Sequence, residues 1–383
     1  MISNKYKIRE QNESLILKGI IDHKNISRAE LSSLTGLNKA SVSSITKGLL
    51  DDGLIFETGI GSAGTQGGRK PIMLQFNPKV AAALSFDIGI DYLKGTLAYL
   101  NGEEITFIEK KRLNVSAKTV IALLKETITA IQKENPEVCS TIIGMTIGIH
   151  GVVHNHQVIF TPYYDLDTID LHKQLSKSFD FPIFIENEAN LAALGEYAFS
   201  DSSESLVSLS IHSGVGGGVV NSGLVQKGHH GTAGEIGHSI LFPDGKACPC
   251  GNNGCLEQYA SNTVLYEQIA EKKQLDYVDS AVVQSLIDDS EIQTRLEQNA
   301  FWLAVGINNT VALYDPEVVI INSSIYRKIP SLLTKVRDHL TSRFTKDIRV
   351  ENSTLGSQAP LYGGIALCCQ NFLNIQRLKL KHV

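Results

Sequence analysis

The pattern of apolar and polar positions in the first 50 residues predicts three helices. Residues 10–22 carry apolar side chains on one face at helical spacing. Residues 27–30, Ser-Arg-Ala-Glu, have the form of a capping box, which predicts the start of a second helix. Gly36 predicts the turn after it, and Asn38 can cap a third helix. Two helices joined by a tight turn are typical of a helix-turn-helix.

The predicted third helix has two different faces. Val42, Ile45 and Leu49 recur at i, i+3 and i+7 and should point inward. The opposite face is small and polar, with Ala40, Ser43, Ser44 and Lys47. A helix with such an outer face fits the DNA major groove, which is about 12 Å wide.

Two alternating strands follow, around Leu54 and Phe56 and from Ile72 to Phe76. The segment between them is rich in glycine and ends in Arg69 and Lys70, so it predicts a wing that can approach a minor groove. A solvated hairpin tip would explain the same residues. The winged helix-turn-helix hypothesis places the DNA contacts on Asn38, Lys39, Ala40, Ser43, Ser44, Lys47, Arg69 and Lys70.

The charge distribution agrees with this hypothesis. Residues 1–77 carry ten Lys or Arg and seven Asp or Glu, whereas the other 306 residues carry 25 and 33. A basic module in front of an acidic body is expected where the module binds a polyanion. Charge alone fits a solvated basic face equally well.

After residue 78 the pattern changes to that of an α/β chain. Apolar strands are predicted at 81–88, 92–100, 142–148 and 182–185, with a helix at 119–133. Polar side chains stand where these strands end. Ligands of α/β sheets bind beyond the carboxyl ends of the strands, so Asp87, Asn187 and Glu188 should converge on one crevice.

A second sheet is predicted from residue 206 onward. Its elements are a strand at 206–212, a glycine loop at 213–218, a strand at 219–221, helices within 291–313, a strand at 318–322 and a helix at 361–373. The glycine loop could hold a phosphate. Turn geometry alone also requires glycine, so this evidence is weak.

The segment from residue 228 to 261 holds a candidate metal site. His238 precedes a C-x-C-x4-C run of Cys248, Cys250 and Cys255, a ligand set that tetrahedral zinc takes. Four protein ligands close the site, so the metal would have a structural role. The alternative is three reduced cysteines in a turn rich in Gly and Pro.

Composition and length set outer limits. A chain of 383 residues with 43% apolar residues should form two or three globular domains. No apolar run approaches the ~20 residues that span a bilayer, and the polar N-terminus does not resemble a signal peptide. These features predict a cytoplasmic protein. Cys139, Cys368 and Cys369 have the pattern of small buried residues, which suits a reducing compartment.

Several motifs together resemble the ROK family (repressor, open reading frame, kinase), and within it the regulators of sugar catabolism of the xylose-repressor type. They are Glu235-x-Gly237-His238, the cysteine run ending in Glu257, the ENEAN run at 186–190 and the winged helix. The resemblance implies a winged helix at 1–77 and two actin-like, hexokinase-like (ribonuclease-H-like) lobes, at 78–200 with 368–383 and at 201–367. It also implies zinc on His238, Cys248, Cys250 and Cys255. A sugar would lie between the lobes, against Asn187, Glu188, Glu235, His238 and Glu257.

The chain departs from the kinases of this family. Their phosphate loop, Asp-x-Gly-Gly-Thr-Lys, is replaced by the run Asp87-Ile88-Gly89-Ile90-Asp91-Tyr92. Asp91 would repel a phosphate at ~4 Å by about 4 kcal/mol per charge pair at an effective dielectric constant near 20. Glu188 replaces the catalytic Asp, and residues 322–324, Asn-Ser-Ser, replace a glycine-rich loop on the adenosine side. ATP is therefore not expected as a cofactor, and no enzymatic activity is expected.

Two functions compete. The first is a repressor of carbohydrate genes, with xylose as the family-level sugar, which binds operator DNA as a homodimer or tetramer and is released by a monosaccharide. The second is an ATP-dependent sugar kinase with an accessory DNA-binding domain. A third hypothesis is control by a partner protein with no sugar bound.

Overall fold

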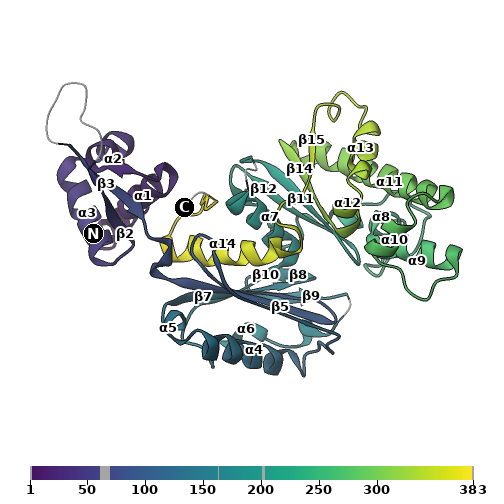
Figure 1. Ribbon diagram of the computed structural model, residues 1–383, viewed down its shortest axis with the longest axis horizontal. Coiled ribbons are helices and arrows are strands. Elements are labelled where there is room, and N and C mark those ends of the chain that lie inside the picture. The colour runs from purple at the N-terminus through teal and green to yellow at the C-terminus, as the bar shows by residue number, and fades with distance from the viewer. Residues whose placement is uncertain (1, 61–69, 163, 201–202, 382–383) are drawn as a thin grey trace.

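The computed structural model describes residues 2–60, 70–162, 164–200 and 203–381. Three bodies lie side by side in Figure 1: a small N-terminal module and two lobes, each built on a five-stranded sheet. Helix α14 (Ala359–Leu373) runs across the centre of the view, along the sheet of the first lobe. No helix within the described ranges is long and apolar enough to cross a lipid bilayer.

The N-terminal module is a winged helix-turn-helix. Its elements are α1 (Ile2–His23), β1 (Ile26–Ser27), α2 (Arg28–Thr35), α3 (Lys39–Asp51), β2 (Ile55–Ile60) and β3 (Ile72–Phe76). The predicted capping box is present, because the Ser27 hydroxyl accepts from the backbone of Glu30 and the Glu30 carboxylate accepts from that of Ser27. The Asn38 side chain caps α3 by accepting from the Ser41 amide at 2.8 Å. Both predicted helix starts are therefore confirmed.

The first lobe has the strand order β10-β7-β4-β5-β6. Its strands are β4 (Ala82–Ile88), β5 (Tyr92–Tyr99), β6 (Glu104–Lys111), β7 (Ile142–Ile149) and β10 (Ile183–Asn187). Helices α4 (Val120–Glu134), α5 (Pro136–Cys139) and α6 (Leu171–Leu175) lie on one side, with α7 (Glu188–Phe199) and α14 on the other. A hairpin of β8 (Val152–His154) and β9 (Gln157–Phe160) follows β7. Strands β4, β7 and β10 are parallel, so their carboxyl ends share one edge of the sheet.

The second lobe has the strand order β13-β12-β11-β14-β15. Its strands are β11 (Leu206–Ile211), β12 (Val215–Asn221), β13 (Leu224–Val225), β14 (Val318–Ser323) and β15 (Arg349–Asn352). Its helices are α8 (Glu257–Ala260), α9 (Asn262–Lys273), α10 (Ser280–Ser285), α11 (Ser290–Tyr314), α12 (Ser324–Lys328) and α13 (Ser331–Asp338). Most of their buried side chains form one hydrophobic cluster with the sheet.

The glycine loop predicted at 213–218 is mostly a strand, so that prediction was wrong. Residues 215–218 belong to β12 and pair with β11. Glycine is needed here because neighbouring backbone comes too close for a side chain. A Cβ atom at Gly218 would lie 2.2 Å from the carbonyl oxygen of Ala189 in α7, and one at Gly217 would lie 2.7 Å from that of Gly234.

The N-terminal module shares a hydrophobic core with the body. One cluster contains buried side chains of the module together with those of α7, α14 and the segment after α14. Leu378 and Leu380 of that segment are fully buried, and the Leu380 amide donates to Ala198 of α7 at 2.7 Å. The module is therefore packed against the body and is not merely tethered to it. The domain boundaries at residues 77, 200 and 367 remain a prediction.

Candidate functional site

A cavity of about 380 Å³ lies between the two lobes. The first lobe supplies the end of β7, the β8–β9 hairpin and the start of α7, and the second supplies the β11–β12 turn and the cysteine-rich turn. All five residues predicted to contact a sugar line it: Asn187, Glu188, Glu235, His238 and Glu257. This volume falls within the ~300–1,000 Å³ usual for small-molecule sites. Of the residues predicted to converge on a crevice, Asn187 and Glu188 line this cavity, whereas Asp87 lines an adjoining one. Carboxylates of both lobes line the first cavity.

Asn187 and Glu188 reach the cavity for different reasons. Asn187 is the N-cap of α7: its Oδ1 accepts from the Asn190 amide at 2.9 Å, and its Nδ2 donates to the Gly151 carbonyl at 2.8 Å. Its amide therefore holds α7 against the loop after β7. Glu188 is the first residue of α7, and its buried carboxylate accepts from the Ser210 hydroxyl at 3.1 Å. This bond joins the two lobes.

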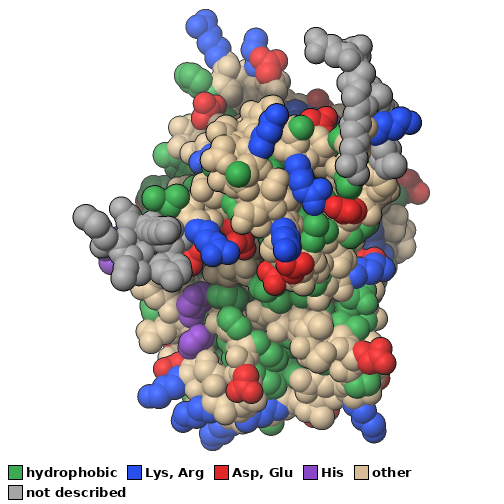
Figure 2. All heavy atoms as spheres, turned by 90° about the vertical axis from the view of Figure 1, so that its left-hand side faces the viewer, with side chains coloured by type: hydrophobic (Ala, Val, Ile, Leu, Met, Phe, Trp, Pro, Cys, Tyr) green, Lys and Arg blue, Asp and Glu red, His purple; other side chains and the backbone are tan. Residues whose placement is uncertain are grey.

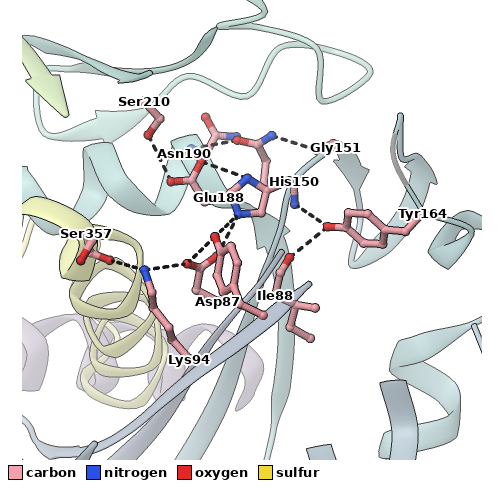
Figure 3. A network of polar contacts seen from close by, with 12 residues as sticks. Asp87, Ile88, Lys94, His150, Gly151, Tyr164, Glu188, Asn190, Ser210 and Ser357 are labelled. Carbon is pink, nitrogen blue, oxygen red and sulfur yellow. Dashed lines mark hydrogen bonds and ion pairs between the residues drawn. The ribbon is translucent and has the colours of Figure 1, made fainter. Parts of the chain in front are cut away.

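Glu188 belongs to a buried polar network with Asp87 and His150 (Figure 3). His150 Nε2 lies 3.1 Å from Asp87 Oδ1, and its Nδ1 lies 3.8 Å from Glu188 Oε2. The Tyr92 hydroxyl donates to Asp87 Oδ2 at 3.1 Å and lies 2.8 Å from His150 Nε2. Behind them the Tyr164 hydroxyl accepts from the His150 amide and donates to the Ile88 carbonyl, both at 3.0 Å. The imidazole is thus fixed between two carboxylates.

The charges in this network follow from burial and pairing. Burial alone would lower the pKa of His150, but the hydrogen bond to Asp87 and the charge of Glu188 raise it to about 9. Burial raises the pKa of Glu188, and the His150 cation partly opposes this effect. Burial would also raise the pKa of Asp87, yet its bond to His150 lowers it. At neutral pH, His150 is therefore an imidazolium.

A second cavity, of about 710 Å³, adjoins the first and shares His150 and Glu188 with it. The turn from Gly89 to Tyr92 lines it, at the place where the sequence predicted a spoiled phosphate loop. The Tyr92 ring lies across this turn: a Cβ atom at Gly89 would be 2.1 Å from it. Ile90 and Asp91 are exposed at the same turn. A turn that binds phosphate needs accessible backbone amides. Here an apolar side chain, a carboxylate and an aromatic ring occupy the turn instead.

The four predicted metal ligands meet in the second lobe. The ligand atoms of His238, Cys248, Cys250 and Cys255 lie within 4.8 Å of one another. Cys248 Sγ is 3.5 Å from His238 Nδ1, and Cys250 Sγ is 3.6 Å from Cys255 Sγ. A tetrahedral zinc with Zn–S bonds of ≈ 2.3 Å separates its ligand atoms by roughly 3.5–3.8 Å. The donor set and spacing therefore fit such a metal ion.

Glu257 and Glu235 connect this cluster to the cavity. Glu257 Oε1 accepts from the Cys248 thiol at 3.0 Å and lies 3.5 Å from His238 Nδ1. Glu235 Oε2 lies 3.8 Å from His238 Nε2. Burial raises the pKa of the Cys248 thiol, so a bound metal would have to displace its proton. The positions of both cavity acids, Glu235 and Glu257, therefore depend on how well the cysteine-rich turn is ordered.

The predicted DNA contacts on α3 share one exposed face. Asn38, Lys39, Ala40, Ser43, Ser44 and Lys47 are all exposed, and so is Lys70 next to β3; Arg69 lies outside the described residues. Figure 2 faces this end of the molecule and shows Lys and Arg side chains scattered among Asp and Glu. The candidate surface therefore rests on the exposure of these residues and not on a continuous basic patch.

Sequence reasoning missed several residues of the site. His150 and Tyr92 complete the network around Asp87, and Phe160, a residue that is 41% exposed, lines the cavity. His150 had a usable signal, because it follows the end of β7 as Glu188 follows the end of β10. Tyr92 belongs to the run that replaces the phosphate loop, but its bond to Asp87 had no signal in the sequence, and neither had the place of Phe160.

The fold and this inter-lobe site define a class: the chain belongs to the ROK family, whose sequence pattern matches residues 83–371. It is 32% identical over 389 residues to the xylose repressor of Bacillus spizizenii, with 98% of this chain and 100% of that protein aligned. The crystal structure of an ROK family transcriptional regulator, a homologue of Escherichia coli Mlc, matches 98% of this chain and 100% of its own at 27% identity with a TM-score of 0.82.

An ROK family glucokinase from Streptomyces griseus, solved with glucose and AMPPNP, matches 75% of this chain and 99% of its own. Its identity is 22% and its TM-score 0.66, so this likeness concerns the fold alone. Together these findings confirm the predicted family and fold class.

Proposed function

We propose that this protein is a transcriptional repressor that binds operator DNA through its winged helix and responds to a monosaccharide bound between its lobes. The observation that carries the proposal is the cavity lined by three carboxylates, in a chain that aligns over its whole length with a xylose repressor. Sugar hydroxyls donate to carboxylates in charge-assisted hydrogen bonds, so Glu188, Glu235 and Glu257 can hold several hydroxyls at once. D-Xylose is the sugar we propose to test first.

The route from the cavity to the DNA-binding module runs through two helices. Glu188 begins α7, and the backbones of α7 and α14 come close at Gly195, where a Cβ atom would lie 2.3 Å from the Ala359 carbonyl oxygen. Helix α14 and the following segment share the hydrophobic cluster of the winged helix. A change in lobe closure at α7 would therefore move the surface on which the module rests.

Zinc would be held by His238, Cys248, Cys250 and Cys255, with a structural role. When bound, it would supply a rigid link between the cysteine-rich turn and the rest of the lobe. The cavity acids Glu235 and Glu257 would then stand at fixed positions. Sugar binding thus depends on the metal, whereas the module at the other end of the chain does not contact it.

The repressor would act as a homodimer, with tetramers as a further possibility. Two winged helices must stand ~34–36 Å apart to enter successive major grooves on one side of DNA. A sugar can shift the equilibrium between binding and non-binding arrangements only by its difference in affinity for them. Release therefore requires that the sugar bind more tightly to the arrangement that spoils this spacing.

Sugar kinase activity is the alternative, and the turn at residues 89–92 argues against it. Ile90, Asp91 and Tyr92 belong to the run that replaces the family's phosphate loop, and they line the second cavity. We therefore expect no sugar-dependent release of ADP in a coupled assay with xylose, glucose and other aldoses. Turnover above 1 per second, in the usual range of kinases, would favour the kinase instead.

Gel shifts of the full-length, zinc-loaded protein on operator DNA, with and without D-xylose, test the proposal. Wild type should bind and be released by the sugar. Glu235→Ala and Glu257→Ala should bind with near-normal affinity and resist release, because each loses hydrogen bonds worth about 1.5–3 kcal/mol, or roughly 10- to 150-fold in sugar affinity. Glu126→Ala, an exposed change on α4, is the matched control and should behave as wild type.

Calorimetry adds a test of the coupling. Operator DNA should weaken sugar binding by the same factor by which sugar weakens operator binding. Equal sugar affinities with and without operator, in a protein that sugar releases, would contradict a two-state mechanism. Release by a partner protein with no effect of any sugar would favour the third hypothesis.

A further inference from the structure

The cavity wall carries a proton donor and a proton acceptor side by side. His150 Nδ1 and Glu188 Oε2 are 3.8 Å apart, and both residues line the cavity. They come from different elements, the loop after β7 and the first turn of α7. Because the turn beside them lacks the family's phosphate loop, we expect no bound ATP there and therefore no phosphoryl group for transfer to a sugar hydroxyl. What they can do without a second substrate is move protons.

An aldose in its ring form offers a substrate for such a pair. Its anomeric hydroxyl and its ring oxygen are bonded to the same carbon, so a donor and an acceptor less than 4 Å apart can contact both. We propose that His150 and Glu188 catalyse the interconversion of the α and β anomers of the aldose bound in the cavity. This inference rests on the proposed sugar site and adds a chemical activity to it.

The reaction is balanced and consumes nothing. The Glu188 carboxylate accepts the proton of the anomeric hydroxyl while His150 gives its Nδ1 proton to the ring oxygen. The bond between the anomeric carbon and the ring oxygen breaks, and the hydroxyl becomes a carbonyl. After rotation of the aldehyde, the ring oxygen attacks the other face of the carbonyl. Both protons then return by the reverse transfers, leaving each side chain as it began.

The surroundings of His150 favour this role. Its Nε2 faces Asp87 and Tyr92, which fix the ring and leave Nδ1 on the side of Glu188. Other titratable or charged groups also face it from the neighbouring elements: Lys94 from β5, Tyr164 from the loop after β9 and His212 from the end of β11. Burial lowers the pKa of His212 to about 4, so this neighbour stays neutral and does not compete as an acid.

Such an activity would suit a sensor. The carboxylates of both lobes would hold the two anomers differently, and each anomer is only part of the dissolved sugar. Exchange within the cavity would let either anomer enter and be converted to the bound form. The sensor would then respond to the total sugar concentration without waiting for exchange in solution.

Polarimetry of freshly dissolved α-D-xylose tests the proposal. With the full-length, zinc-loaded protein, the first-order rate of mutarotation should exceed the buffer rate in proportion to protein concentration. His150→Asn and Glu188→Gln should each lower the protein-dependent rate by about 100-fold or more, the usual contribution of general acid–base catalysis. The rate should also fall above about pH 9, where His150 loses its proton.

Matched controls are His339→Asn and Glu126→Gln, which change the same residue types away from the cavity and should keep the wild-type rate. Circular dichroism checks that every variant is folded. If D-xylose binds and releases operator while mutarotation stays at the buffer rate, the activity is refuted and the repressor function stands. If D-xylose neither binds nor interconverts faster, both proposals fail for this sugar. Full activity in both site variants would refute the assignment of these residues.

Discussion

Gly218→Ala tests how closely strand β12 packs under helix α7. The added Cβ would lie 2.2 Å from the Ala189 carbonyl oxygen and 2.6 Å from the Ala193 Cβ. Ordinary contacts begin near 3.4 Å, so the two elements must separate by about 1 Å. Neither neighbour is the movable end of a flexible side chain. Overpacking of this kind costs about 1–3 kcal/mol, and we expect the upper end of that range.

The same displacement should reach the sugar site. Helix α7 begins at Glu188, whose carboxylate bonds Ser210 of the second lobe, so a shift of about 1 Å changes the spacing across the cavity. Misplacement by that distance can weaken a positioned function by on the order of 100-fold. We therefore expect a weaker response to D-xylose in gel shifts. Because α7 and α14 share the hydrophobic cluster of the module, we also expect an altered operator affinity without sugar.

Guanidinium unfolding followed by circular dichroism gives the stability change. Gly48→Ala is the matched control: it lies in α3, nothing comes within 4 Å of its added Cβ, and alanine should stabilise the helix by up to about 1 kcal/mol. If Gly218→Ala unfolds at the wild-type midpoint and keeps its sugar response, the close approach of β12 and α7 is not what requires glycine there.

Three further predictions concern DNA, metal and pH. Lys47→Ala and Lys70→Ala should weaken operator binding, whereas the control Lys125→Ala should not. Loss of a phosphate contact lowers the slope of log binding constant against log salt concentration by about one unit. Unchanged gel shifts for both variants would refute the proposed surface. Elemental analysis should find about one zinc per chain. Cys250→Ser should lose the zinc and the sugar response but keep operator binding, whereas the control Cys139→Ser should keep all three. A zinc-free protein that still responds to sugar would contradict the proposed site. Since the pKa of His150 is raised from 6.5 to about 9, its stabilisation is complete below pH 6.5 and is lost as the pH rises through 9. The wild type should therefore lose free energy of unfolding, on the order of 3 kcal/mol at most, and His150→Gln should not. Thermal unfolding at several pH values measures this; an equal pH dependence in the two proteins would contradict the prediction.

Local signals in the sequence predicted the winged helix well. The capping box at Ser27 and the cap at Asn38 depend on residues three positions apart, so both can be recognised from the local sequence without knowledge of tertiary contacts. The crevice was also predictable, because parallel strands that end in polar residues bring those residues to one edge. Asp87 and Glu188 lie on either side of His150 as that rule requires.

The missed features depend on contacts between distant segments. Residues 215–218 have the composition of a loop, and only the approach of α7 and of the turn at Gly234 explains why a strand carries three consecutive glycines. Tyr92 sits in a short turn whose direction the sequence does not specify. The segment after α14 lacks a clear period, yet Leu378 and Leu380 are buried because they pack in the cluster that the module shares with α7 and α14.

The shared core of the winged helix has a consequence for the engineering of hybrid regulators. The segment after α14 packs in the same hydrophobic cluster as α1, and the Ser14 hydroxyl donates to the Leu373 carbonyl at 3.5 Å. The described residues of the module and residues 374–381 therefore share one hydrophobic core, although they are far apart in the sequence. Chimeras that exchange DNA specificity between relatives should take both segments from the same parent. A swap of the N-terminal segment alone would join two surfaces that evolved with different partners.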